Sequence, residues 1–181
     1  MMMRLPFLIS LIIVAGIAMT SCGGNESASR ATTEIVKVDA ATAATVSGTV
    51  LFDGTPPART DVSMESDPAC AAGHEGLTDD VTQAVLVTDG KLANVFVYVS
   101  EGIKGSTTPP DAPAVIDQKG CRYHPHVIGV VAGQKVEFRN SDATLHNVHS
   151  EAKVNRAFNI AQATQGKVDT KVFSEPEQMI P

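Results

Sequence analysis

Short runs of alternating apolar and polar residues dominate the chain after residue 45. The alternation is clearest in Asn94-Val95-Phe96-Val97-Tyr98-Val99 and in Lys135-Val136-Glu137-Phe138-Arg139. A period of two places successive side chains on opposite faces of a β-strand. Asp-Gly pairs, which favour the tight turn of a β-hairpin, follow two of the runs. The predicted strands cover 46–52, 84–88, 93–100, 114–118, 127–132, 134–139, 145–149 and 167–173.

This arrangement of short strands indicates an all-β fold. Several strands separated by turns, with no long helical pattern among them, are typical of a β-sandwich. The segment 46–181 is long enough to form one domain with a hydrophobic core. The alternative is an α+β domain in which 154–165 forms a short helix, since that stretch has tolerable helix propensity.

The first residues of the chain form a different pattern. One basic residue, Arg4, precedes an apolar run from Leu5 to Met19, which is short for a membrane span and is followed by small residues up to Cys22. This pattern predicts a secretory signal peptide at 1–21. The tetrapeptide ending at Cys22 resembles the lipobox of bacterial lipoproteins. That resemblance implies that Cys22 is acylated and anchors an exported protein to a bacterial membrane, facing the periplasm or the cell surface.

A flexible tether is predicted at 22–45, where Ala, Thr, Ser and Gly predominate. Without the signal peptide, which carries one Arg, 13 basic side chains remain against 20 acidic ones, a net charge of −7. The chain has no Trp and no basic stripe. Because nucleic-acid binding depends on neutralising phosphates with Lys and Arg, we do not expect a nucleic-acid partner.

Four of the five histidines lie between residues 121 and 149. Imidazoles at this density in an acidic exported domain either bind a metal or need another explanation. Because Pro125 keeps the chain extended, His124 and His126 are expected to point to one side, either as ligands or as a structural hydrogen-bonded segment. Alternation places His149 opposite His146 unless a bulge intervenes. The fifth histidine, His74, is the weakest candidate.

Two cysteines remain if Cys22 carries a lipid. Outside the cytoplasm, such a pair forms a disulfide more often than it binds metal, so we expect a bridge between Cys70 and Cys121. The alternative is a thiolate metal site, for which Cys121-x-x-His124-x-His126 has a suitable spacing.

One stretch carries a resemblance to a known family. Gly133 leads into an alternating strand that ends at Asn140, and after a polar loop His146-Asn147-Val148 begins the next strand. This is similar to cupredoxins of the plastocyanin and azurin kind, which are Greek-key β-sandwiches. The resemblance implies that His146 is a copper ligand and that Asn147 helps to lock a neighbouring ligand loop.

The same resemblance implies a type 1 copper site with a Cys, a second His and a Met from one later loop. No such loop occurs before Pro181, so the resemblance implies that the site is completed beyond Pro181 and that the domain is incomplete at its C-terminal end. Over most of 46–181 the chain also looks like bacterial plastocyanin-like proteins of the methylamine-utilization type. That likeness implies electron transfer with redox partners such as c-type cytochromes or membrane oxidoreductases.

Two other functions stay open. One is a non-redox surface lipoprotein module that binds polysaccharide or a partner protein, because the opening Gly-x-Val-x-Phe-Asp-Gly-x-Pro-Pro also occurs in sandwich domains without metal. The other is a copper chaperone or buffer that uses the four clustered histidines. The sequence contains no His-Glu-x-x-His and no Gly-x-Ser-x-Gly, so we do not expect an enzyme.

Overall fold

The computed structural model describes residues 35–36, 39, 41–74, 84–102, 105 and 107–181. All of them belong to the second of two units, Thr33–Pro181. The expected signal peptide, the expected lipidation site at Cys22 and much of the expected tether lie outside these residues. Within the described ranges, no helix is both long enough and apolar enough to cross a bilayer.

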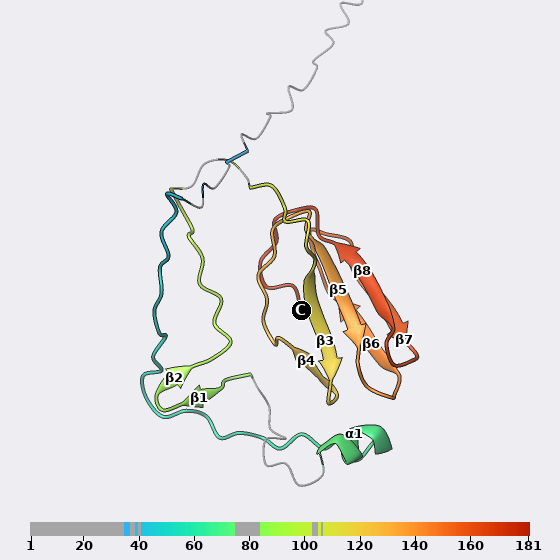
Figure 1. Cartoon of the computed structure of the whole chain (residues 1–181). Helices are drawn as coiled ribbons and strands as arrows, with labels where there is room; N and C mark the ends of the chain where they lie inside the picture. Colours follow the sequence, from blue (N-terminus) through green and yellow to red (C-terminus); the bar gives the residue numbers. More distant parts are fainter. Residues whose placement is uncertain (1–34, 37–38, 40, 75–83, 103–104, 106) are drawn as a thin grey trace, which may run out of the picture. The chain divides into compact units, whose positions relative to one another are not determined.

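The described fold is mostly β, with one short helix, α1 (Pro68–His74), as Figure 1 shows. The strands are β1 (Val87–Thr88), β2 (Lys91–Leu92), β3 (Ala114–Lys119), β4 (Arg122–His124), β5 (Lys135–Asn140), β6 (His146–Ser150), β7 (Phe158–Gln162) and β8 (Val168–Val172). Strands β3, β5, β6 and β8 fall closely on predicted runs, which confirms the all-β prediction at this level.

Four strands form a mixed sheet in the order β4-β3-β5-β8. Strands β3 and β5 are parallel, whereas β4 and β8 run antiparallel to their neighbours. Strands β6 and β7 pair separately in antiparallel fashion, and β1 and β2 form a third pair. The parallel register sets Gln118 beside Asn140, so the ends of β3 and β5 meet at the same edge of the sheet.

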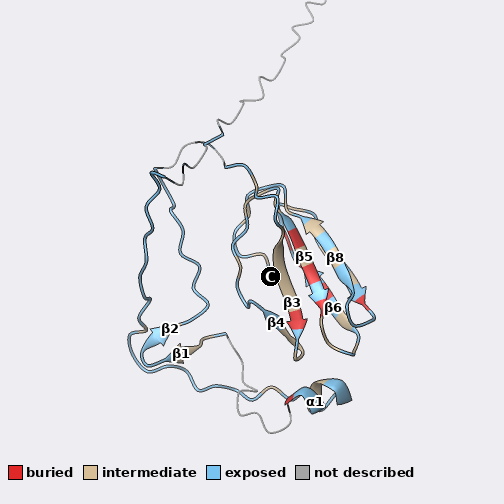
Figure 2. Cartoon of the chain, viewed as in Figure 1, coloured by how far each residue is buried: buried red, intermediate tan, exposed pale blue. Residues whose placement is uncertain are grey.

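The hydrophobic core joins the mixed sheet to the β6–β7 pair. Val136 and Phe138 on β5 are buried, as is Val148 on β6, whereas Glu137 between the first two is only partly buried. Figure 2 shows the buried stretches along β5. Apolar side chains packed against this cluster are Ala114, Ile116, Phe158, Ile160 and Phe173. Burying one side chain of this size contributes about 1.5–3 kcal/mol, so the alternation on β5 decides which face packs.

The turn between β1 and β2 confirms the hairpin predicted from Asp89-Gly90. Both residues have positive φ angles, +51° and +71° respectively. A two-residue hairpin turn of this kind needs both residues in the left-handed conformation, with positive φ. Gly adopts this conformation without penalty, and Asp adopts it more readily than most residues. The dipeptide therefore fixes the pairing of Val87 with Leu92.

Three predicted strands, at 46–52, 93–100 and 127–132, are not strands in the structure. Leu51 is 72% exposed and Val97 is 75% exposed. Two backbone hydrogen bonds and one isolated bridge join 50–52 to the β1–β2 hairpin, but no ladder extends along these runs in the described chain. The prediction was wrong there because alternation reports two unlike faces, whereas a strand also needs a neighbour for its amides and carbonyls.

The helix considered at 154–165 is also wrong, because β7 occupies its centre. Phe158, Ile160 and Gln162 point inward along β7, and Val148 pairs with Ile160 across the β6–β7 ladder. The segment forms a strand despite its modest helix propensity because the period of two packs two large apolar side chains, both partly buried, against the core. The helix that does form, α1, begins after Asp67, whose Oδ1 accepts the amide hydrogens of Ala69 and Cys70.

A carboxylate fastens the segment after β8 to the loop after β6. Glu177 accepts the backbone amides of Asn155 and Lys153, and the Asn155 side chain also donates to it. These hydrogen bonds, with the Asn155 amide contributing most, lower the pKa of Glu177 from 4.5 to about 2 despite the opposing effect of burial. Its stabilising contribution is therefore complete above about pH 4.5 and is lost as the pH falls towards 2.

We therefore expect Glu177→Gln to lower the melting temperature at pH 6 and to have a much smaller effect at pH 2.5. Thermal unfolding followed by circular dichroism at both pH values measures the difference. Glu151→Gln is the matched control, because the Glu151 side chain is exposed and makes no hydrogen bond with another described residue. A Glu177→Gln effect of equal size at both pH values would contradict this account.

Candidate metal centre

Three amide side chains mark the end of the core nearest His146. On β3, β5 and β7 an apolar core residue is followed two positions later by an amide that faces the same way. These amides are Gln118, Asn140 and Gln162, and all are buried. The strand register brings them together, because Gln118 lies beside Asn140 and Gln162 lies beside His146. The apolar core therefore gives way to a polar layer at this end.

The buried side-chain amide of Gln162 has a hydrogen-bond partner at both its nitrogen and its oxygen. Its Nε2 donates to the carbonyl of Phe138 at 2.9 Å and to the carboxylate of Asp169 at 3.0 Å. Its Oε1 accepts a hydrogen bond from the side chain of Gln118. Because a buried amide without partners is destabilising, this network fixes where β7 lies against β3 and β5.

Asn140 organises the loop between β5 and β6. Its Nδ2 donates to the carbonyls of Thr144 (2.8 Å) and Gln162 (3.0 Å), and its Oδ1 accepts the amide of Asp142 (2.9 Å). The side chain is almost fully buried, with 1% exposed. These hydrogen bonds hold the loop at both ends. Asn140 therefore fixes where the loop delivers His146 at the start of β6.

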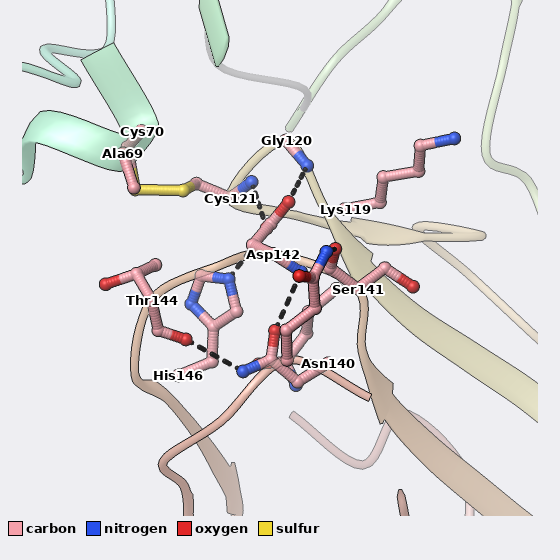
Figure 3. Close-up of polar contacts among 12 residues, drawn as sticks. Ala69, Cys70, Lys119, Gly120, Cys121, Asn140, Ser141, Asp142, Thr144 and His146 are labelled. Atoms are coloured by element: carbon pink, nitrogen blue, oxygen red, sulfur yellow. Dashed lines mark hydrogen bonds and ion pairs between the residues drawn. A yellow bond between two sulfur atoms is a disulfide. The ribbon is translucent and has the colours of Figure 1, made fainter. Parts of the chain in front are cut away.

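Asp142 and His146 form the centre of the site (Figure 3). His146 Nε2 lies 2.7 Å from Asp142 Oδ2, and their side chains are 14% and 16% exposed. The same carboxylate accepts the amides of Gly120 and Cys121, both at 2.8 Å. Burial raises the pKa of Asp142, but the bonds from Cys121, His146 and Gly120 outweigh it and leave that pKa below its ordinary value. Asp142 is therefore an anion that orients the imidazole.

This orientation bears on which ring nitrogen of His146 can bind a metal. A neutral imidazole carries one proton, and the acceptor at Nε2 favours placing that proton there. No hydrogen bond in the described part of the chain engages Nδ1, whose lone pair then remains available. Histidine ligands of metals usually donate their second ring N–H to a carboxylate, a backbone carbonyl or water.

Cys121 completes a compact group with Asp142 and His146. Each of the three offers one ligand atom, and these atoms lie within 4.8 Å of one another. The structure also contains the expected disulfide between Cys70 and Cys121, so the Cys121 sulfur is covalently occupied. In this oxidised state the group offers an imidazole and a carboxylate but no thiolate.

The helix α1 is fastened to the same loop by a second link. Asp67 accepts the amides of Ala69 and Cys70 through Oδ1, while its Oδ2 accepts the hydroxyl of Thr144 at 2.7 Å. These hydrogen bonds, that of Thr144 first, lower the pKa of Asp67. The backbone around Cys70 therefore remains attached to the His146 loop by contacts other than the disulfide.

The other predicted histidine ligands lie elsewhere. His124 and His126 are exposed, and His124 bonds to the carbonyl of Lys119 at 3.1 Å. His149 is exposed on the face of β6 opposite His146, as strand alternation predicts. None of them joins the group of three described above. His74 is buried at the end of α1, where its Nε2 contacts the carbonyl of Gly120.

A small cavity of about 140 Å³ opens beside the site. Its lining residues are Gln118, Cys121, Arg122, Tyr123, His146 and Asn147. Tyr123 donates its hydroxyl to the Asn147 carbonyl at 2.9 Å, and burial raises the pKa of this tyrosine. The Asn147 side chain is exposed and makes no hydrogen bond with another described residue, whereas Asn140 holds the loop before β6.

Sequence reasoning missed Asp142, Asn140 and the two buried glutamines as parts of the site. A usable signal was present, because an amide stands two residues after a core residue in three strands. The comparisons with known proteins add no further assignment: no family model matches the chain, and no curated protein or solved structure matches it significantly.

Proposed function

We propose that this protein is an exported, lipid-anchored copper-binding protein that transfers electrons from a cupredoxin-like Greek-key β-sandwich. The observation that supports this most is the pair His146–Asp142, in which the carboxylate holds Nε2 and leaves Nδ1 for a metal. The stiff strand ends around it suit an electron carrier, since a metal site that changes little between Cu(I) and Cu(II) transfers electrons faster.

The described donors fit copper in part. Imidazole is a good copper ligand, and His146 supplies one. A type 1 site also needs a thiolate, which neither described cysteine supplies because both are in the disulfide. In cupredoxins, which the chain resembles, that thiolate comes with a second His and a Met from one further loop. When bound, copper would supply one-electron chemistry, while Asp142 fixes the His146 ring and Asn140 fixes the loop that carries it.

Export and anchoring are supported by two independent features. The N-terminal pattern ends at Cys22 in a lipobox-like tetrapeptide. The Cys70–Cys121 disulfide suits an oxidising compartment outside the cytoplasm. The tether then lets the domain reach membrane-bound redox partners, such as c-type cytochromes or membrane oxidoreductases.

Copper titration of the oxidised chain tests the assignment of His146. We expect His146→Ala to weaken Cu(II) binding at least tenfold and Asp142→Asn to weaken it about tenfold, because both the ligand and its orienting group matter. His149→Ala is the matched control and should leave the affinity unchanged, since His149 lies on the opposite face of β6. Binding is measured by calorimetry, and the copper spectrum reports nitrogen ligation.

Other results of the titration favour the other functions. Loss of binding on mutating His124, His126 or His149, with His146→Ala unaffected, favours a histidine-based copper buffer. Absence of specific Cu(II) binding in the unmodified chain contradicts the assignment of His146 and favours a metal-free surface module. A type 1 site completed by such a loop would give an intense visible band from its thiolate–Cu(II) bond.

A further inference from the structure

The Cys70–Cys121 disulfide lies directly against the His146–Asp142 pair (Figure 3). We propose that reduction of this disulfide creates a four-coordinate zinc site from the two cysteine thiolates, Nε2 of His146 and one carboxylate oxygen of Asp142, with zinc taking the place of the hydrogen bond between His146 and Asp142. The inference shares His146 with the proposed function but does not depend on it, because every ligand is among the described residues. While the disulfide is intact, its two sulfur atoms cannot bind a metal.

The donor set matches the preferences of zinc. Zn²⁺ binds Cys sulfur, His nitrogen and Asp oxygen, and most structural zinc sites are tetrahedral. The ligand atoms of Cys121, Asp142 and His146 already lie within 4.8 Å of one another. Cys70 is the partner of Cys121, and their Cα atoms are 5.7 Å apart. Three of the four ligand atoms therefore already lie close together, and the Cys70 sulfur, which is bonded to the Cys121 sulfur, has only to turn towards them.

The two cysteines remain near the site when the sulfur–sulfur bond is broken. The Cys121 amide donates to Asp142, and the Cys70 amide donates to Asp67. Asp67 in turn accepts the Thr144 hydroxyl from the loop that carries His146. These bonds tie both thiols to one loop, so reduction leaves the donors close together. Such preorganisation lowers the entropy lost when a metal binds.

A small dithiol can reduce the Cys70–Cys121 bridge. Two electrons and two protons pass from the dithiol to the bridge, which gives two thiols here and a disulfide in the dithiol. Zn²⁺ then displaces one proton from each thiol to form two Zn–S bonds. In the oxidised state the sulfurs have no thiolate form, so the same residues bind zinc poorly.

The cavity beside the site gives a route for metal. Cys121 and His146 are among its lining residues, and its volume is about 140 Å³. This volume holds several water molecules, or an ion that has kept part of its hydration shell. The side chains of Asp142 and His146 are each partly exposed. A metal can therefore reach the ligands without unfolding of β6.

Zinc titration of the full chain, before and after reduction, tests the proposal. A phosphine reductant is removed under anaerobic conditions, and Zn²⁺ affinity is measured by competition with a chromophoric chelator. We expect one zinc ion per reduced chain, bound at least about 100-fold more tightly than by the oxidised chain. With Co²⁺ as the probe, absorption bands from thiolate–cobalt bonds should appear only after reduction.

The controls assign each ligand. The double variant Cys70→Ser/Cys121→Ser retains Cys22, so any binding through that thiol appears in it as well. Reduced His146→Ala and Asp142→Asn should each lose at least tenfold in zinc affinity, whereas reduced His149→Ala should match the unmodified chain. Equal zinc affinity before and after reduction, or equal affinity in the double variant, would overturn the proposal.

Folding of the reduced chain is checked by circular dichroism before metal is added. If the reduced chain has lost structure, zinc should restore it in the unmodified protein and not in the double variant; failure to restore it overturns the proposal. The copper titration is carried out on the oxidised chain and the zinc titration on the reduced chain. Each proposal can therefore fail while the other stands.

Discussion

Asn140→Ala is expected to lower the free energy of unfolding by about 3–5 kcal/mol. The side chain is 1% exposed and makes three hydrogen bonds, to the Asp142 amide and to the carbonyls of Thr144 and Gln162. Alanine leaves all three backbone groups without this partner. It also releases the loop before β6, so Cu(II) binding by the oxidised chain should weaken with stability.

Urea denaturation of the variant measures the loss in stability. Asn147→Ala is the matched control, since Asn147 has the same side chain in the same region but is exposed. We expect that control to change the free energy of unfolding by less than about 0.5 kcal/mol. Equal effects from the two substitutions would show that Asn140 does not organise the loop.

Removing the disulfide with Cys70→Ser/Cys121→Ser should destabilise the oxidised protein by about 4 kcal/mol. The bridge joins residues separated by 51 positions, and closing a loop of this length restricts the unfolded chain by about that amount. The hydrogen bond between Asp67 and Thr144 remains in the variant, so α1 should stay attached in the folded state. The loss therefore comes mainly from the greater freedom of the unfolded chain.

Chemical denaturation without reductant gives the comparison. Cys22→Ser leaves the bridge intact and serves as the control. A second measurement adds reductant to the unmodified protein, which should then match the double variant. If the double variant is as stable as the oxidised protein, the bridge contributes little and the loop-closure argument is wrong.

The strands that could be predicted from the sequence are those whose alternation coincides with a core. Strand β5 is the clearest case, because Val136 and Phe138 alternate with charged residues and both are buried. The run at 93–100 alternates equally well, yet Phe96 is 54% exposed and the run forms no strand. Pairing depends on residues far away in the chain, and a local period of two carries no information about them.

The residues of the site likewise divide into those that a local sequence pattern can reveal and those that depend on distant parts of the chain. His146 could be singled out because it follows a recognisable strand and loop. Asp142 could not, because its role depends on the turn at Gly120 and Cys121, which approaches from another strand. The burial of His74 against Gly120 was equally hidden, since it requires α1 to lie against that turn. Contacts between loops are set by the whole fold.

The bridge between Cys70 and Cys121 also determines what happens when the backbone between them is cut. A protease that cuts the backbone once anywhere between these residues produces two polypeptides that stay joined through sulfur. The piece that begins the chain and the piece that carries β6 would not separate until a reductant arrived. A nicked molecule would therefore keep its two parts together, and electrophoresis would reveal the cut only in the presence of reductant.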